Sequence, residues 1–357
     1  MNGLKILKRF HLYLGLSVGL IVSFSGITGA LYIWQPELTT LFSPKLFTVD
    51  NNTNTSYTDI LKTIHKIEEK QSNSIVRINL PYRKQQSISV SYTNNNTLYY
   101  HPKTGQYLGS NSKVASFFKT LLNLHRNLGI DGWGKYIMGS SALIFAFFIL
   151  SSGLIMWYKI YKKKLKKGFK INWKSKKKKF NFNVHKVAGI YFVLPLFIMA
   201  TTGGYFTFKK QYIQILNTIP YFNQVSFSSL KLPKIGDSLS LNTLTTQLYP
   251  TYKLRTINYP STTKPNYKYR FINNIVINSG LRKATDINTT KDLKITKITS
   301  YNSDTLTNKI TAQMYPIHIG ESFGILNRVF IFICGFVPLI LYITGIRFYF
   351  YRKKIIK

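Results

Sequence analysis

The chain has 357 residues, of which 45% are apolar, and 49 Lys and Arg against 11 Asp and Glu give a net charge of +38. This charge does not indicate nucleic-acid binding, because twelve lysines lie between positions 159 and 179, beside a long apolar block where anionic lipid headgroups attract them. Cys334 is the only cysteine, which excludes an intrachain disulfide, a cysteine-ligated iron–sulfur cluster and a zinc site made of cysteines alone.

Four apolar blocks of 22 or 23 residues divide the chain. They cover residues 12–34, 136–158, 187–208 and 329–350 and contain almost no charge. A helix of about 20 apolar residues is long enough to cross a hydrocarbon layer of roughly 30 Å. The sequence therefore predicts a mainly α-helical, multi-pass membrane protein with four transmembrane helices.

Residues 1–34 hold the N-terminus and the first of these helices. The block is too long for the apolar region of a signal peptide, and it runs into Trp34 and Pro36 without a small-residue cleavage site. We therefore expect a retained membrane anchor.

Residues 35–118 are expected to form a small α+β module outside the membrane. An amphipathic helix, YTDILKTIHKIEEK, begins at Tyr57, and the alternating runs SIVRINL, SISVSY and NTLYYH predict strands, with a turn at PKTGQ.

The second transmembrane helix and its approach occupy residues 119–158. A basic loop follows over 159–183, and the third helix covers 184–208.

Residues 209–316 are expected to form a second α+β module, with strands at KLRTINY, YKYRFI and LKITKITSY. Residues 317–357 then hold the fourth transmembrane helix, its approach and a short tail. Acidic residues are too scarce for a conventional hydrolase, since the only ones in this second module are Asp237, Asp286, Asp292 and Asp304.

Basic residues near the ends of the helices set the expected topology. They gather in MNGLKILKR before the first helix, in the loop between the second and third, and in RKKIIK after the fourth. Both termini are therefore expected in the cytoplasm. The two α+β modules then lie on the opposite side, which in a bacterium is the periplasm.

A histidine stands at the approach to each of the four helices. His11 and His185 lie at the expected cytoplasmic ends of helices one and three, whereas His125 and His318 lie on the outer side. Two neutral imidazoles that face each other from different helices are typical of the axial ligands of a haem iron. We therefore predict two haem groups, one on each side, each with two histidine ligands.

Glycines follow these histidines at helical spacing. Gly15 and Gly189 lie four residues after His11 and His185, on the same helix face, and are predicted to belong to the cofactor-binding site. Gly29 and Gly203 follow eighteen residues after the same histidines and return to that face. Small residues there could admit a flat ring or a neighbouring helix.

Other interpretations of the histidines stay open. A single histidine at a membrane interface is more often a headgroup contact than a ligand. The protein could be a haem-free membrane-anchored binding or regulatory protein whose outer modules bind a partner such as a peptidase. It could also be a transporter subunit in which the histidines relay protons. His65 and His101 are interpreted as ordinary surface histidines.

Several motifs resemble one family, the PepSY-associated transmembrane proteins of bacterial inner membranes, which include ferric-siderophore reductases. They are HLYLGLSVGLIVSFSGITGALY, LHRNLGI with SSGLIMWYK, HKVAGIYFVLPLFIMATTGGYF, and IHIGESFGILNRVF with ITGIRFYF. The run NTLYYHPKTGQYLG is similar to the end of a PepSY domain. The family usually has an aspartate before the proline, where this chain has His101.

The resemblance implies a four-helix inner-membrane protein with two PepSY-like periplasmic segments. It implies b-type haem ligated by His11, His125, His185 and His318, and electron transfer to ferric chelates such as ferric siderophores outside the membrane. The chain has no GxGxxG dinucleotide-binding motif, so a ferric-chelate reductase of this kind needs a separate electron donor, either quinol or a cytoplasmic reductase.

Overall fold

The computed structural model describes residues 3–49, 56–71, 74–82, 85–225, 232–238, 240–248, 252–273, 280–353 and 355. The chain divides into two compact units, which we call the helical unit and the sheet unit. The helical unit consists of Met1–Gln35, Phe118–Tyr212 and Met314–Lys357, and the sheet unit consists of Pro36–Phe117 and Ile213–Gln313.

The helical unit contains four helices that are long and apolar enough to cross a membrane, as predicted. The four candidate spans are Gly3–Ile33, Gly134–Tyr161, Lys177–Thr207 and Glu321–Arg352. Its elements are α1 (Gly3–Ile33), α5 (Lys113–Asn127, from Phe118 on), α6 (Gly134–Ile144), the π-helix η2 (Phe145–Leu150), α7 (Ser151–Tyr161), α8 (Leu165–Gly168), α9 (Lys177–Thr207), α10 (Lys209–Asn217, up to Tyr212), α13 (Met314–His318), η5 (Glu321–Phe323) and α14 (Gly324–Arg352).

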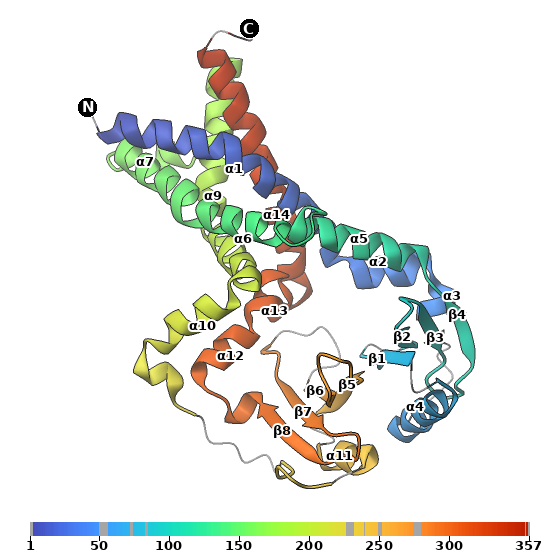
Figure 1. Cartoon of the computed structure of the whole chain (residues 1–357). Coiled ribbons are helices and arrows are strands. Elements are labelled where there is room, and N and C mark those ends of the chain that lie inside the picture. Colours follow the sequence, from blue (N-terminus) through green and yellow to red (C-terminus); the bar gives the residue numbers. More distant parts are fainter. Residues whose placement is uncertain are drawn as a thin grey trace. The chain divides into compact units, whose positions relative to one another are not determined.

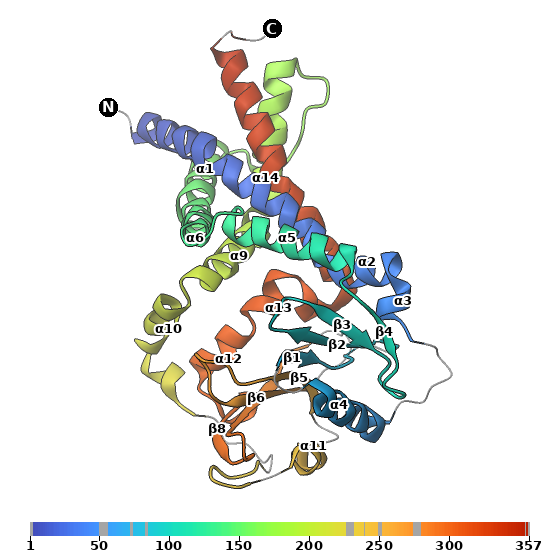
Figure 2. The ribbon, with the colours of Figure 1, turned by 45° about the vertical axis from the view of Figure 1, so that its right-hand side comes forward.

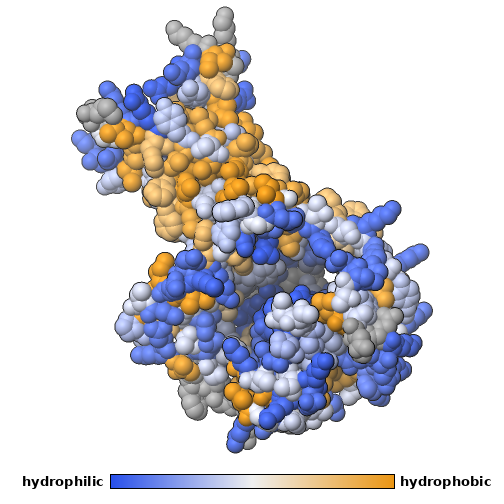
Figure 3. All heavy atoms as spheres, in the orientation of Figure 1, coloured by the Kyte–Doolittle hydropathy of each residue, from blue (hydrophilic) through white to orange (hydrophobic). Residues whose placement is uncertain are grey.

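Apolar side chains cover the outside of these helices (Figure 3). Tyr191, Leu194 and Leu20 are all more than half exposed within their spans. A helix face of this kind is stable against lipid and not against water. The exposed apolar surface therefore agrees with the four candidate spans.

Small residues let the spans approach one another closely. Gly26 of α1 lies against Gly335 of α14, and Gly139 of α6 lies against Thr207 of α9, with no room for a Cβ atom at either contact. The start of α1 and the end of α14 lie at the same end of the helical unit (Figures 1 and 2).

The sheet unit is built on one antiparallel sheet of eight strands in the order β4-β3-β2-β1-β5-β6-β7-β8. Its strands are β1 (Ile75–Asn79), β2 (Ile88–Tyr92), β3 (Thr97–Tyr100), β4 (Tyr107–Ser110), β5 (Lys253–Asn258), β6 (Tyr267–Ile272), β7 (Ala284–Thr289) and β8 (Ile295–Ser300). The helices and short turns of this unit are α2 (Gln35–Phe42), α3 (Pro44–Phe47), α4 (Tyr57–Gln71), η3 (Pro220–Asn223), α11 (Leu241–Leu248), η4 (Tyr301–Ser303) and α12 (Leu306–Ala312).

The prediction of two separate α+β segments is wrong, because the structure has a single α+β unit. Strand β1 of the first predicted module pairs with β5 of the second, with Ile78 opposite Ile257. Both side chains are fully buried. Two separate four-stranded sheets would each leave a row of unpaired backbone groups at this edge, and pairing β1 with β5 removes both rows.

The core of the sheet unit is shared by both predicted modules. Ile64 of α4 and Leu244 of α11 belong to one apolar cluster with Ile78 and Ile257. The predicted helix at Tyr57 and the strands at SIVRINL, SISVSY, NTLYYH, KLRTINY, YKYRFI and LKITKITSY are confirmed.

Strand β7 was not predicted, and its burial pattern explains why. Three of its residues point into the core, and two of them are the fully buried Thr285 and Thr289, which flank Ile287. An alternation with a single apolar residue gives almost no strand signal.

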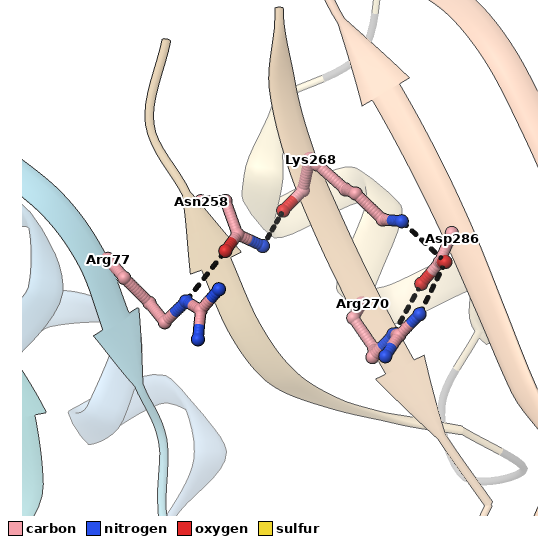
Figure 4. A network of polar contacts seen from close by, with 5 residues as sticks. All are labelled: Arg77, Asn258, Lys268, Arg270 and Asp286. Atoms are coloured by element: carbon pink, nitrogen blue, oxygen red, sulfur yellow. Dashed lines mark hydrogen bonds and ion pairs between the residues drawn. The ribbon is translucent and has the colours of Figure 1, made fainter. Parts of the chain in front are cut away.

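The opposite face of the sheet is polar and carries a network of charged and amide side chains (Figure 4). Arg77 donates to Asn258 Oδ1 over 2.7 Å, and Arg270 makes a two-pronged contact with Asp286 at 2.7 and 2.8 Å. Lys268 Nζ lies 2.9 Å from the same carboxylate. Desolvation acts to raise the pKa of Asp286, but Arg270 and Lys268 hold this pKa below its usual range.

Candidate functional site

His11 and His185, which we call the first pair, come together from two spans. Each is the ninth residue of a helix of 31 residues, His11 in α1 and His185 in α9. Their ring centroids lie 6.2 Å apart, and the ring planes are inclined at 86°. The sequence predicted these two side chains as partners, and the structure places their rings face to edge.

His125 and His318, the second pair, are also neighbours. They stand near the ends of α5 and α13, the two short helices that lead into the second and fourth spans. Their ring centroids are again 6.2 Å apart, with an angle of 44° between the planes. The edge of the Phe206 ring packs on His318 at 5.6 Å.

Each of the four imidazoles is held by a hydrogen bond at Nδ1. A backbone carbonyl accepts in three cases: Ser25 O for His125 at 2.9 Å, Leu341 O for His185 at 2.9 Å and Met199 O for His318 at 3.0 Å. Since a carbonyl oxygen only accepts, Nδ1 carries the proton and Nε2 keeps its lone pair. Nδ1 of His11 lies 2.8 Å from the Ser152 hydroxyl.

A glycine lies against Cε1 of every ring. A Cβ atom at Gly153 would come within 3.3 Å of His11, and one at Gly345 within 3.3 Å of His185. The corresponding distances are 2.7 Å from Gly29 to His125 and 3.3 Å from Gly203 to His318. These glycines therefore let each ring approach the backbone of a neighbouring span.

The predicted glycines Gly15 and Gly189 have a different environment. Nothing lies within 4 Å of a Cβ atom built at Gly15, and at Gly189 the nearest atom is Leu341 Cδ2 at 3.8 Å. They do not touch the histidine rings and leave space one turn beyond them. Their assignment to a cofactor site stays a prediction.

Sequence reasoning missed Gly153 and Gly345, although a signal was present. In each span, a Ser or Thr followed by a glycine contacts one histidine ring. These hydroxyl–glycine dipeptides are Thr28–Gly29, Ser152–Gly153, Thr202–Gly203 and Thr344–Gly345. The prediction followed glycines along the helix that carries the histidine, whereas the contact is made with the neighbouring helix.

The spacing of the rings fits ligation of one metal by each pair. A first-row metal binds a histidine nitrogen at about 2.0 Å, and that nitrogen lies roughly 1.1 Å from its ring centroid, so opposed ligands have centroids about 6 Å apart. Histidines that bind metals through Nε2 commonly donate Nδ1–H to a backbone carbonyl. The spacing is present in both pairs, and the bond to a carbonyl is present at His125, His185 and His318.

A cavity of about 190 Å³ adjoins the second pair. Ser25, Gly26, Gly29 and Gly203 line it together with apolar side chains, and the cations Arg126 and Lys135 stand among its polar residues. An apolar, glycine-lined space with a few polar groups suits a flat organic group whose acidic substituents need cationic partners.

The two pairs lie toward opposite ends of the spans. Gly29, which contacts the second pair, follows His11 of the first pair by eighteen residues on α1, and Gly203 follows His185 by eighteen on α9. Eighteen residues of helix extend about 27 Å, close to the thickness of a hydrocarbon layer.

Arg328 is a buried cation that the sequence analysis did not single out. It is 1% exposed, it donates to Ile33 O of α1, and its guanidinium lies 4.8 Å from the centre of the Trp34 ring. It joins the end of α1 to the start of α14, ten residues after His318. Trp34, at the end of the first apolar block, is thus the stacking partner of this cation.

The two remaining histidines lie in the sheet unit. His65 is exposed beside Glu69, as predicted. His101 differs from the prediction of an ordinary surface residue, because its Nδ1 accepts backbone N–H groups of Lys103 and Thr104 at 3.1 and 3.3 Å. An aspartate before the proline would accept the same kind of bonds, so His101 serves as a turn-stabilising substitute for it.

Comparison with known proteins gives a family for the chain. None of the curated proteins matches the chain. The family model described as the PepSY-associated TM region matches residues 8–352, nearly the whole chain, so this membrane protein belongs to the PepSY_TM family.

Proposed function

We propose that the chain is a haem-containing reductase of a bacterial inner membrane. It passes electrons across the membrane to a ferric chelate, such as a ferric siderophore, and so releases Fe(II). The observation that carries the proposal is the equal 6.2 Å separation of the imidazoles in both pairs, one pair toward each end of the spans.

Four histidines would hold two b-type haems, His11 with His185 and His125 with His318. A haem with two imidazole ligands supplies one-electron transfer at an iron whose ligands stay in place. The protein's part is to present neutral imidazoles from separate helices and to keep their orientation. The carbonyls of Ser25, Leu341 and Met199 do this by fixing the proton on Nδ1.

The apolar spans exclude water and ions from the space between the two pairs. Val18, Phe145, Leu196 and Val337 form a buried cluster within the helical unit. An apolar shell of this kind controls solvent access and the local dielectric, and with them the redox potential.

The ferric chelate is the proposed substrate, and the sheet unit is the proposed place of contact. Arg77, Lys268 and Arg270 stand on its polar face, together with the carboxylate of Asp286 (Figure 4). Cationic side chains attract anionic chelates. We place this unit in the periplasm and both termini in the cytoplasm. A separate protein or quinol supplies the electrons.

Absorption spectra of the full-length protein, oxidised and dithionite-reduced, test the cofactor. We expect the bands of low-spin b-type haem. H11A or H185A should remove one haem, and H125A or H318A the other. The control is H65A, which changes an exposed histidine and should leave the spectrum intact.

Colourless protein from cells that make enough haem would contradict the proposal and favour a haem-free binding protein or a transporter subunit. If haem is bound, ferric-chelate reduction is measured in membrane vesicles with an Fe(II)-trapping dye. If haem is bound but no ferric chelate is reduced, the protein would be an electron carrier that reduces a different substrate.

A further inference from the structure

Each hydroxyl–glycine dipeptide places an oxygen beside a histidine Nδ1. The distances from Nδ1 are 2.8 Å to Ser152 Oγ, 3.0 Å to Thr202 Oγ1, 3.2 Å to Thr344 Oγ1 and 3.5 Å to Thr28 Oγ1. Four different spans thus repeat the same contact, one for each histidine.

The single proton of each hydroxyl is already donated within its own helix. Thr202 donates to Ile198 O at 2.6 Å, and Thr344 donates to Ile340 O at 2.6 Å. Ser152 donates to Ile149 O at 2.9 Å, and Thr28 to Phe24 O at 2.9 Å. A hydroxyl whose proton is engaged can only accept from another group.

The direction of the bond to each imidazole follows from this. With its proton held by a helix carbonyl, the hydroxyl accepts from Nδ1–H, as the nearby backbone carbonyl also does at His125, His185 and His318. An imidazole with the proton on Nε2 would instead hold the lone pair of Nδ1 against an oxygen lone pair at hydrogen-bond distance in each of these sites.

We propose that the four hydroxyl–glycine dipeptides are positioning elements that fix each histidine as its Nδ1–H tautomer. The glycine lets the ring reach the neighbouring helix, and the hydroxyl adds an acceptor that selects the tautomer and increases the electron donation of Nε2. The tautomer stands on the hydrogen bonds alone, whereas its use at a metal rests on the proposed function.

The four dipeptides should affect the histidine tautomer to different extents, according to the distance between the hydroxyl oxygen and Nδ1. Ser152 is the 2.8 Å partner of His11, and Thr202 makes the shortest of the three threonine contacts. Thr28, at 3.5 Å, is the weakest. The expected order of effect is Ser152 and Thr202, then Thr344, then Thr28.

The first experiment does not need haem. Full-length protein is labelled with ¹⁵N-histidine, prepared without haem, and the nitrogen shifts at neutral pH give the tautomer of each ring. We expect Nδ1–H for His11, His125, His185 and His318, the opposite of the form that free histidine prefers in water. S152A should move His11 toward a mixture, S152T should restore it, and S151A is the matched control.

The second experiment measures the midpoint potential of the haem-loaded protein. T202V keeps the shape of the side chain and removes the hydroxyl acceptor. The second pair should then bind oxidised haem less well, relative to reduced haem, by roughly threefold to tenfold. This is a rise of about 28 to 59 mV, at 59 mV for each factor of ten. T202S should restore the original potential.

The matched control is T201V, because Thr201 makes the same bond to its own helix, 2.8 Å to Phe197 O, without a bond to a histidine. Nδ1 without a proton in the haem-free protein, or equal potentials for T202V and T201V, would overturn the inference. Colourless protein with the Nδ1–H tautomer would instead leave the inference standing and remove the proposed function.

Discussion

The two halves of the chain, residues 3–161 and 177–352, repeat one order of elements. Each half has a span, a helix followed by a four-stranded antiparallel meander, a short helix that ends near a histidine, and a second span. Each histidine bonds to a span of its own half but faces a histidine of the other half. Neither half by itself therefore contains a complete pair.

The halves differ in the span that follows the second histidine. His125 precedes Gly153 by 28 residues, whereas His318 precedes Gly345 by 27. Among the described residues, only the first half contains a π-helix, η2, which ends at Leu150, two residues before Ser152. A π-helix takes more residues per turn than an α-helix. It can thus accommodate the extra residue while Ser152 and Gly153 still face His11.

Equivalent glycines of the two halves give the largest predicted effect. G29L and G203L each place a side chain where a histidine ring of the second pair now lies. Each should abolish the second-pair haem, with a cost of about 1–3 kcal/mol in stability from overpacking. The spectrum and haem content give the result, and the first-pair haem is the internal control. Loss of different haems in the two variants would break the equivalence.

The joined sheet is tested at the strand where the halves meet. I78A removes a fully buried side chain opposite Ile257 and should lower the free energy of unfolding by about 3 kcal/mol. V76A, on the same strand but 45% exposed, should cost only about 0.5 kcal/mol. Chemical unfolding of the full chain measures both, and equal effects would argue against the shared core.

Arg328 sharpens the comparison because the equivalent residue of the first half is exposed. Arg328 stands ten residues after His318 and is buried, whereas Lys135 stands ten residues after His125 and is exposed. R328M should destabilise the protein by about 2 kcal/mol, since a charged hydrogen bond to Ile33 O and the contact with Trp34 are lost. R328K keeps the charge without the planar guanidinium. Its melting temperature should lie between those of the unchanged protein and R328M. An unchanged melting temperature for R328M would show that the buried contact contributes nothing.

The charged network of the sheet gives the smallest effect, and its ion pairs lie in the second half, where Lys268 and Arg270 of β6 contact Asp286 of β7. D286N should cost about 1 kcal/mol at neutral pH, because Arg270 is half exposed. The lowered pKa of Asp286 means that this stabilisation is present above the unfolded-state pKa of about 3.9 and is lost as the pH falls through the folded-state value. Unfolding of D286N should lack this acid-dependent part, and an identical pH profile for both proteins would contradict it.

Local patterns in the sequence determined the spans, most strands and the partners of the four histidines. Apolar blocks of membrane length and the sidedness of basic residues are read along the chain, and together they sorted His11 with His185 and His125 with His318. Their use as ligands remains a prediction from those patterns.

Only the tertiary structure decided the contacts between residues far apart in the chain. It joined β1 to β5, brought Gly153 and Gly345 to histidines on other helices, and buried Arg328. None of these leaves a periodic signal, because each depends on how two segments approach and not on how one segment folds. The strand β7 was missed for a related reason: its core side is formed mainly by threonines, whose burial is imposed by the neighbouring strands.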